Sequence, residues 1–422
     1  MNREQDEKRS VPITAMPPSA PERDNTPEAT AVEPDMPSDE SGRHDQAHRF
    51  VALPKFPSPL RHPLRAAGWL LRTLFGIITL ILLLAVVAAV PVLNFAVLGY
   101  LLDVEGRVAR SGRLRDAFPA LGIAPQLGSV VLGIWLWIFP LRLLSSAAAD
   151  ARLVDPAGTS AAFLRTATTV AGCFVAVHLC LAIARGGRFW CFLRPIKNIR
   201  WLLQQFRVSY NWDQAADSVR IFVRGLEIRR RIWLGIRGFA GAFVWMVLPT
   251  ALFASAERTE GVAFLISIVG GLGLMLVFSW LPFLQARFAA ENRWRALFEL
   301  GAVREMFRRA PLVYWLALLL VFALSLPLYL TKVVLPPRDA MWLVTLVFIV
   351  SMYPTRVAVG WAYHWAANRP AQSWFGWRWL GRILTLATLG AYVFLLFFTQ
   401  FIGERGKGVL FEHHAFLLPV PF

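Results

Sequence analysis

Three polar residues stand in apolar stretches that are long enough to cross a membrane: Asn94, Arg142 and Arg165. A polar side chain is costly at membrane depth, so these residues are the first candidates for function. Two guanidinium groups and an amide can hydrogen-bond an anionic lipid head group or an anionic substrate. The alternative is that Arg142 and Arg165, near the outer ends of neighbouring segments, extend their charges to the membrane surface as anchors.

Catalytic and metal chemistry find little support in the residue pattern. His178 has no acidic neighbour in its apolar segment, so we expect a neutral imidazole bonded to a backbone carbonyl. Glu412, His413 and His414 are adjacent, but the further ligands that a metal site requires do not accompany them. No serine or threonine lies in a nucleophile-elbow pattern. We therefore predict no enzyme activity, no catalytic, metal-binding or cofactor-binding residues, and no cofactor.

The composition places the chain among membrane proteins. Hydrophobic residues make up 56% of its 422 residues, and its formal net charge is +17. The positive charge is not gathered in one soluble patch, which argues against a nucleic-acid partner. Residues 1–60 are rich in proline and acidic side chains and poor in apolar runs, so we predict a disordered tail there. Residues 61–422 then form the transmembrane domain.

Eight apolar segments follow the tail. About 20 residues of helix cross a hydrocarbon core of about 30 Å. The pattern therefore predicts an all-α, polytopic transmembrane helix bundle of seven to eight membrane segments, with amphipathic interfacial helices. The segments lie at 69–102, 127–147, 161–185, 238–256, 262–286, 312–331, 340–365 and 383–403.

Arginine-rich connections orient these segments. Residues 185–237 are strongly basic, so the positive-inside rule places them in the cytoplasm, and counting back places 103–126 there as well. The collar before segment 69–102 is also basic, so both of its ends favour the same side. We therefore predict that this segment breaks around Pro91–Asn94 and returns as a hairpin or re-entrant element, with the N-terminus in the cytoplasm. A single crossing with the N-terminus outside is the alternative.

Amphipathic helices are expected in the cytoplasmic connections. One helical face carries Ile199, Leu202, Leu203 and Phe206. Such a face beside basic residues is typical of a helix at a membrane surface, although packing beneath the bundle would give the same pattern. A second stripe is expected at 212–226, and two short helices that change register near Gly301 are expected at 287–310. The predicted lipid-surface contacts are Arg200, Arg207, Arg229, Arg230 and Arg231.

Two stretches resemble each other within the chain. "VPVLNFAVLGYLL", from Val90, and "LPFLQARFAAEN", from Leu281, each place a proline near the end of an apolar run. A basic segment and another apolar segment follow in both cases. The pattern suggests a duplicated unit of span, surface helix and span. A duplication would give both stretches the same orientation, which favours the topology with the N-terminus outside.

The stretch "PVLNFAVLGYLLDVEGR" resembles the N-terminal signature of a family of multi-span bacterial membrane proteins of unknown function. "WLPFLQARFAAENRWRALFELGAVREMFRRAP" resembles a later repeat of such proteins and, distantly, the membrane domain of some glycerophosphodiester phosphodiesterases. The chain departs from the family in its acidic tail and in an insert at 185–237. The resemblance implies a bacterial inner membrane protein and supplies no catalytic residues.

Two functions follow as expectations. The first is a non-enzymatic module that organises lipids, above all anionic lipids, or protein partners at the cytoplasmic face. The second is a permease for a small or lipid-like anionic substrate. No Asp or Glu lies inside a predicted segment, which weighs against a proton- or sodium-coupled transporter. A cavity of several hundred Å³ lined by Arg142, Arg165 or Asn94 would favour the permease. A tightly packed bundle with helices at its surface would favour the module.

Overall fold

The computed structural model describes residues 61–207, 227–255, 261–333, 337, 342–402, 406–413 and 416–417. All of them belong to one compact unit, Asp45–Phe422. The tail predicted at 1–60 and the stripe predicted at 212–226 lie outside the described residues, so both remain predictions.

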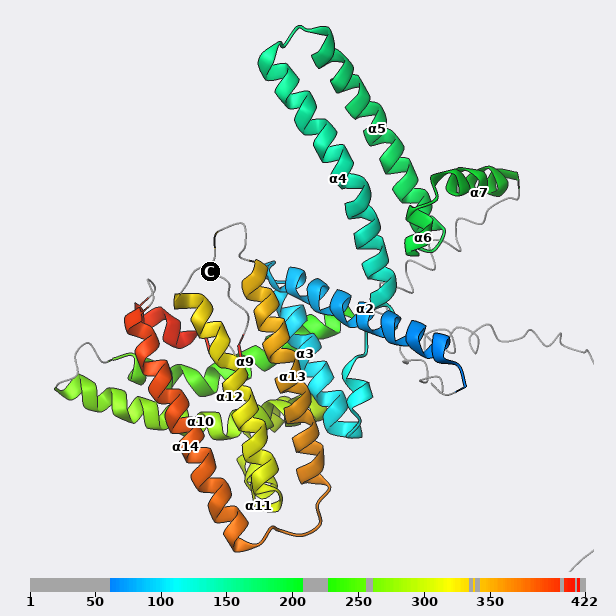
Figure 1. Cartoon of the computed structure of the whole chain (residues 1–422). Coiled ribbons are helices and arrows are strands. Elements are labelled where there is room, and N and C mark those ends of the chain that lie inside the picture. Colours follow the sequence, from blue (N-terminus) through cyan, green and yellow to red (C-terminus); the bar gives the residue numbers. More distant parts are fainter. Residues whose placement is uncertain are drawn as a thin grey trace, which may run out of the picture. The chain divides into compact units, whose positions relative to one another are not determined.

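Every regular element of the described ranges is a helix, as the apolar runs predict (Figure 1). Within the described ranges, eight helices are long and apolar enough to cross a membrane. They correspond in order to the eight predicted segments: α2 (Pro63–Ala88), α4 (Ala124–Val154), α5 (Thr159–Ala184), α9 (Ile228–Phe253), α10 (Val262–Glu291), α12 (Pro311–Val333), α13 (Trp342–Ala367) and α14 (Phe375–Ile402). The chain is therefore an all-α, multi-pass integral membrane protein.

The remaining helices are shorter. They are α3 (Asn94–Ser111), α6 (Phe189–Phe192), α7 (Pro195–Arg207), α11 (Leu300–Arg309) and the 3₁₀ helices η1 (Leu114–Ala117), η2 (Trp294–Phe298) and η4 (Gly406–Phe411). The two short helices expected at 287–310 are only partly correct. Asn292, in the left-handed region with φ 52°, ends α10, and a 3₁₀ turn comes before α11.

The first apolar segment is broken where the proline predicts it. Helix α2 ends at Ala88, turns occupy 91–93, and α3 begins at Asn94. Pro91 has no backbone N–H to donate, and Val92 adopts φ 71°, which is costly for a β-branched residue. The predicted break is thus confirmed, whereas the side to which the chain returns remains a prediction.

Helix α3 packs against α9, α10 and α13, and it is buried on all sides from Val97 to Gly106. The residues just after the first apolar segment, expected as part of a cytoplasmic connection, therefore lie in the centre of the bundle. Close backbone approach makes this packing possible. A Cβ on Gly99 would lie 1.7 Å from the carbonyl oxygen of Arg231, and one on Gly235 would lie 2.0 Å from that of Phe95. Small residues of this kind let membrane helices approach each other closely.

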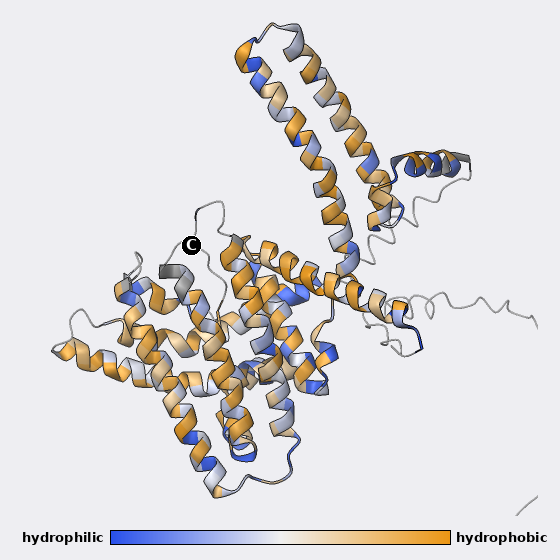
Figure 2. Cartoon of the chain, viewed as in Figure 1, coloured by the Kyte–Doolittle hydropathy of each residue, from blue (hydrophilic) through white to orange (hydrophobic). Residues whose placement is uncertain are grey.

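The α4–α5 pair leaves most of its apolar surface uncovered by protein. In the most apolar window of α4 only 11% of the residues are buried, and in that of α5 17%, compared with 61% in α13. Figure 2 shows apolar residues along the length of both helices. Acyl chains of a bilayer would cover these apolar faces, which the described part of the chain leaves open.

An internal repeat exists, but its register differs from the one that the two proline positions suggest. "LLDVEGRVARSGRLRDAF" (101–118) and "LPFLQARFAAENRWRALF" (281–298) follow the same course residue by residue. Each helix ends on a left-handed residue, Gly112 or Asn292; an extended arginine, Arg113 or Arg293, comes next; and a 3₁₀ helix follows. The prolines are a poor guide because Pro91 breaks its helix, whereas Pro282 lies within α10.

Candidate functional site

A charged residue of α13 is buried between the two repeated helices. Arg356 Nη1 donates hydrogen bonds to Glu105 Oε2 of α3 at 2.9 Å and to Gln285 Oε1 of α10 at 2.8 Å. Glu105 and Gln285 occupy the same position in the two repeats and are fully buried, and Arg356 is 5% exposed. The repeat therefore brings one acidic and one amide acceptor to the same guanidinium group.

One carboxylate oxygen of the ion pair has no hydrogen bond from the described residues. This oxygen is Glu105 Oε1, which is buried. An ionisable group with an open acceptor inside a membrane bundle is a reasonable place to look for function.

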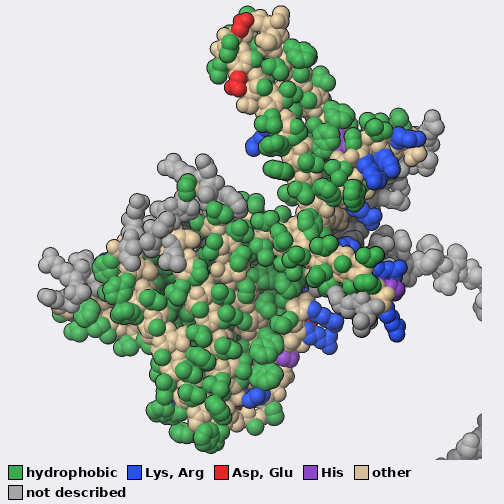
Figure 3. Space-filling model, in the orientation of Figure 1, with side chains coloured by type: hydrophobic (Ala, Val, Ile, Leu, Met, Phe, Trp, Pro, Cys, Tyr) green, Lys and Arg blue, Asp and Glu red, His purple; other side chains and the backbone are tan. Residues whose placement is uncertain are grey.

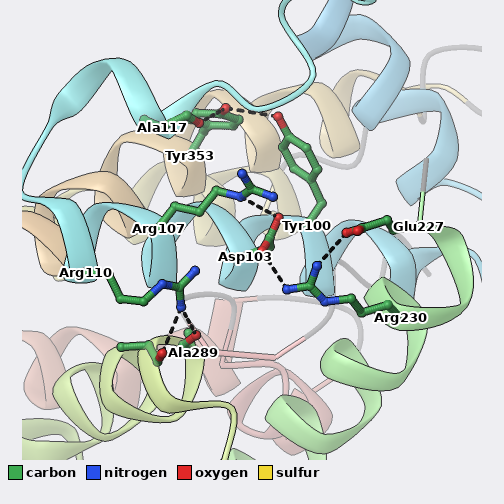
Figure 4. A network of polar contacts seen from close by, with 10 residues as sticks. Tyr100, Asp103, Arg107, Arg110, Ala117, Glu227, Arg230, Ala289 and Tyr353 are labelled. Carbon is green, nitrogen blue, oxygen red and sulfur yellow. Dashed lines mark hydrogen bonds and ion pairs between the residues drawn. The ribbon is translucent and has the colours of Figure 1, made fainter. Parts of the chain in front are cut away.

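Helix α3 also takes part in a second polar network, which involves other residues than this pair (Figure 4). Tyr353 donates to the Ala117 carbonyl at 2.7 Å and lies 3.4 Å from the Tyr100 hydroxyl. Asp103 accepts a hydrogen bond from Arg107 at 3.0 Å and pairs with Arg230 of α9 at 3.8 Å. These contacts join α3 to α9 and α13 through polar groups as well as apolar packing.

One arginine of α3 bonds to the backbone of the repeated helix. Arg110 Nη1 donates to the carbonyls of Ala289 and Ala290 at 3.2 and 2.8 Å. These are among the last carbonyls of α10, which have no partner within the helix. Arg110 therefore caps α10, and loss of hydration lowers its pKa.

Sequence reasoning missed the buried pair. Arg356 lies toward the predicted inner end of segment 340–365, where an arginine is expected to anchor the helix at the membrane surface, and Glu105 lies in the connection predicted to be cytoplasmic. A detectable signal was present in the correct repeat register, which aligns the carboxylate of Glu105 with the amide of Gln285. Arg356 itself carries no local sign of its partners, because they lie far away in the chain.

The structure does not gather the three residues first singled out for substrate or head-group contact. Arg142 lies on α4 and Arg165 on α5, and both are exposed. Asn94 begins α3, and its buried Oδ1 has no hydrogen-bond partner among the described residues. Their proposed role in contacting an anion stays a prediction.

The arginines predicted to contact lipid lie in three different settings. Arg200 is exposed on α7, and Arg207 ends that helix with its side chain outside the described part. Arg229, Arg230 and Arg231 occupy the first turn of α9, which begins ten residues earlier than the predicted segment. Arg229 is exposed, whereas Arg230 pairs with Asp103 and with Glu227 at 2.7 Å, and Arg231 lies over the Tyr100 ring at 5.0 Å.

His178 is bonded to a carbonyl, as its isolated position predicts. Its Nε2 lies 3.0 Å from the Phe192 carbonyl oxygen, and its Nδ1 lies 3.3 Å from Asn198 Nδ2. A neutral ring that donates from Nε2 and accepts at Nδ1 satisfies both contacts. Asn198 of α7 is fully buried and also donates to the Cys191 carbonyl at 2.8 Å. His178 and Asn198 thus fasten α7 to the end of α5.

One histidine of the C-terminal cluster contacts a threonine of α9. His413 is buried, and its Nε2 lies 2.6 Å from the Thr250 hydroxyl of α9. His414 lies outside the described residues. Within the described ranges no group of three potential metal ligands is found.

Comparison with known proteins finds a family match for part of the chain. No curated protein and no solved structure matches the chain. The distant resemblance to the membrane domain of glycerophosphodiester phosphodiesterases therefore stays a prediction. Residues 218–336, which include the later of the two repeated stretches and begin inside the supposed 185–237 insert, match a family described as "Protein of unknown function (DUF4013)".

Proposed function

We propose that this membrane protein is a non-enzymatic module that organises anionic lipids, together with protein partners that meet them, at the cytoplasmic face of a bacterial inner membrane. In this proposal the N-terminus is cytoplasmic and no nucleic acid or cofactor takes part. The observation that supports it best is the exposed amphipathic surface of α7.

Helix α7 carries two uncovered faces that lie side by side. Ile196, Ile199 and Leu203 form the apolar face and are 73%, 45% and 59% exposed. Lys197 and Arg200 project from the adjoining face and are exposed too, and Figure 3 shows basic side chains gathered over this helix. A helix of this composition stabilises itself by placing its apolar face among acyl chains and its cations near anionic head groups.

The hydrogen bonds that hold α7 against α5 determine which face of α7 can contact lipid. Asn198, on the opposite side of the helix, is held by His178 and by Arg185, whose Nη1 donates to the amide oxygen at 2.5 Å. Because these contacts hold Asn198 at the end of span α5, α7 would lie at a membrane border with Ile199 and Leu203 directed away from protein.

A depth measurement tests this arrangement. In a variant without native cysteines, nitroxide labels at Leu203→Cys and Lys197→Cys are compared in phosphatidylglycerol vesicles. We expect the label at 203 to be relaxed by oxygen, which enters lipid, and the label at 197 by a water-soluble nickel chelate. Asn198→Ala should weaken this contrast because α7 loses its fastening. Equal exposure of both labels to the nickel chelate would contradict the proposal.

A permease for a small or lipid-like anionic substrate is the second candidate. It is favoured by the buried Arg356–Glu105 pair, because ionisable residues inside membrane bundles commonly mark transport paths. Reconstituted protein should then move fluorescent phosphatidylglycerol or small organic anions across vesicles. Arg356→Lys should slow this movement roughly tenfold, because an ammonium does not reproduce the planar guanidinium that bonds Glu105 and Gln285. Movement no faster than in protein-free vesicles would exclude this candidate.

A further inference from the structure

A second polar feature lies away from the buried pair and from α7. A cavity of about 480 Å³ is lined by α10, α11, α12 and α14. Its wall contains Ser279, Trp280, Val303, Arg304, Phe307, Arg308, Tyr314, Arg382, Thr385 and Leu386. We call this cavity the arginine pocket.

Three arginines line the pocket together with apolar side chains and three hydroxyl groups. Arg304 and Arg308 come from α11, and Arg382 comes from α14. Among the described residues Arg304 and Arg382 form no ion pair, and Arg308 meets Glu305 only at 3.8 Å. Positive charge in the pocket therefore exceeds negative charge, which suits an anionic ligand.

A neutral donor in the wall is also available to a ligand. Thr385 is buried, and its Oγ1 has no hydrogen-bond partner among the described residues. A buried hydroxyl without a partner is uncommon and usually has a ligand or water as its explanation. This hydroxyl and the guanidinium groups together supply the kind of donors that bind phosphate oxygens.

A second cavity lies against the corresponding helix of the first repeat, α3. This cavity of about 300 Å³ is lined by α2, α3, the start of α4 and the start of α9, and it includes Tyr100 and Arg231. Tyr100 occupies the position in its repeat that Trp280 occupies in the second. Arg231 Nε is buried without a hydrogen-bond partner among the described residues. An aromatic side chain at the same repeat position thus lines a cavity in each case, whereas the arginines come from helices that do not correspond, α9 in one cavity and α11 and α14 in the other.

We propose that the arginine pocket binds an anionic phospholipid, with the head-group phosphate held by Arg304, Arg308 and Arg382. This inference rests on the proposed function, since it assigns one lipid site to the module. The acyl chains would lie along Trp280, Phe307 and Leu386. An apolar wall of this kind has no use in binding free phosphate, and α10, α12 and α14 are all candidate spans, so the ligand is expected to come from the bilayer.

Titration of the full chain in neutral detergent tests the pocket by native mass spectrometry. Dioleoyl phosphatidylglycerol, dioleoyl phosphatidylcholine and inorganic phosphate are added separately. We expect phosphatidylglycerol to bind at least tenfold more tightly than phosphatidylcholine. Arg304→Gln/Arg382→Gln should weaken phosphatidylglycerol binding about tenfold, because two charge-assisted contacts are lost. The milder Thr385→Val should weaken it about threefold, which is the usual effect of one neutral hydrogen bond.

Arg113→Gln/Arg115→Gln is the matched control, because it removes two exposed arginines outside the pocket. This control should change binding less than twofold. Equal effects of the two double variants, with lipid preference intact in the wild type, would overturn the pocket and leave the proposed function standing. Loss of preference in the wild-type protein itself would overturn both. Inorganic phosphate that binds as tightly as the lipid would overturn the assignment to a phospholipid. If Arg304→Gln/Arg382→Gln fails to fold, unchanged binding in Thr385→Val overturns the pocket.

Discussion

Replacing Arg356 by leucine is expected to destabilise the protein by about 3–5 kcal/mol, the usual range when one partner of a buried ion pair is removed. The substitution leaves the Glu105 carboxyl in the bundle with neither of its oxygens bonded by Arg356, and it leaves Gln285 Oε1 without this donor. Thermal or SDS-induced unfolding of the purified protein in detergent, followed by circular dichroism, measures the loss.

A double-mutant cycle separates the lost ion pair from the lost volume of the arginine. Glu105→Met added to Arg356→Leu should recover much of the stability, because no unpaired charge is then left inside the bundle. Glu105→Gln alone keeps an acceptor for Arg356 and introduces the residue type that the second repeat has at this position. It should therefore be milder than Arg356→Leu. Equal losses in the Arg356→Leu single variant and the Arg356→Leu/Glu105→Met double variant would show that the contact between these side chains contributes little.

Gly99→Ala is the second substitution expected to destabilise the protein strongly. We expect its free energy of unfolding to fall by an amount near the upper end of the roughly 1–3 kcal/mol range for overpacking. The added Cβ would lie 1.7 Å from the Arg231 carbonyl oxygen and 3.0 Å from the Gly235 nitrogen. These atoms belong to the α9 backbone, so no side chain can rotate away and the two helices must separate. Measuring the unfolding midpoint shows the effect.

Gly172→Ala provides the matched control within a helix. Gly172 is in α5, and apart from its own helical turn nothing described lies within 4 Å of a Cβ at this position. Alanine is a better helix former than glycine, so this variant should be neutral or more stable by up to about 1 kcal/mol. A Gly99→Ala variant as stable as Gly172→Ala would mean that α3 and α9 do not approach as closely as described.

Hydrophobic length alone located the membrane helices, because every one of them must satisfy its own backbone hydrogen bonds in lipid. This holds for α4, α5 and α12, whose predicted segments lie within or nearly within the helices. The break at Pro91 and the helix at 195–207 could also be predicted from the sequence. A missing N–H and an amphipathic stripe depend only on residues that are neighbours in the chain. Where charges accumulate, as in α3 and the start of α9, hydropathy gave the wrong boundary. Both helices continue through charged residues because partners in the bundle neutralise them.

The residues of the chain by themselves determined a multi-pass helical membrane protein, an interrupted first segment and an amphipathic helix beyond the third one. Only the tertiary structure decided that Arg356 lies between Glu105 and Gln285, that Arg304 and Arg382 line one cavity, and that Arg142 and Arg165 are exposed. Helix formation follows from near neighbours in the chain, whereas the pairing of charges depends on which helices pack together. That choice depends on small residues such as Gly99, which allow backbones to meet.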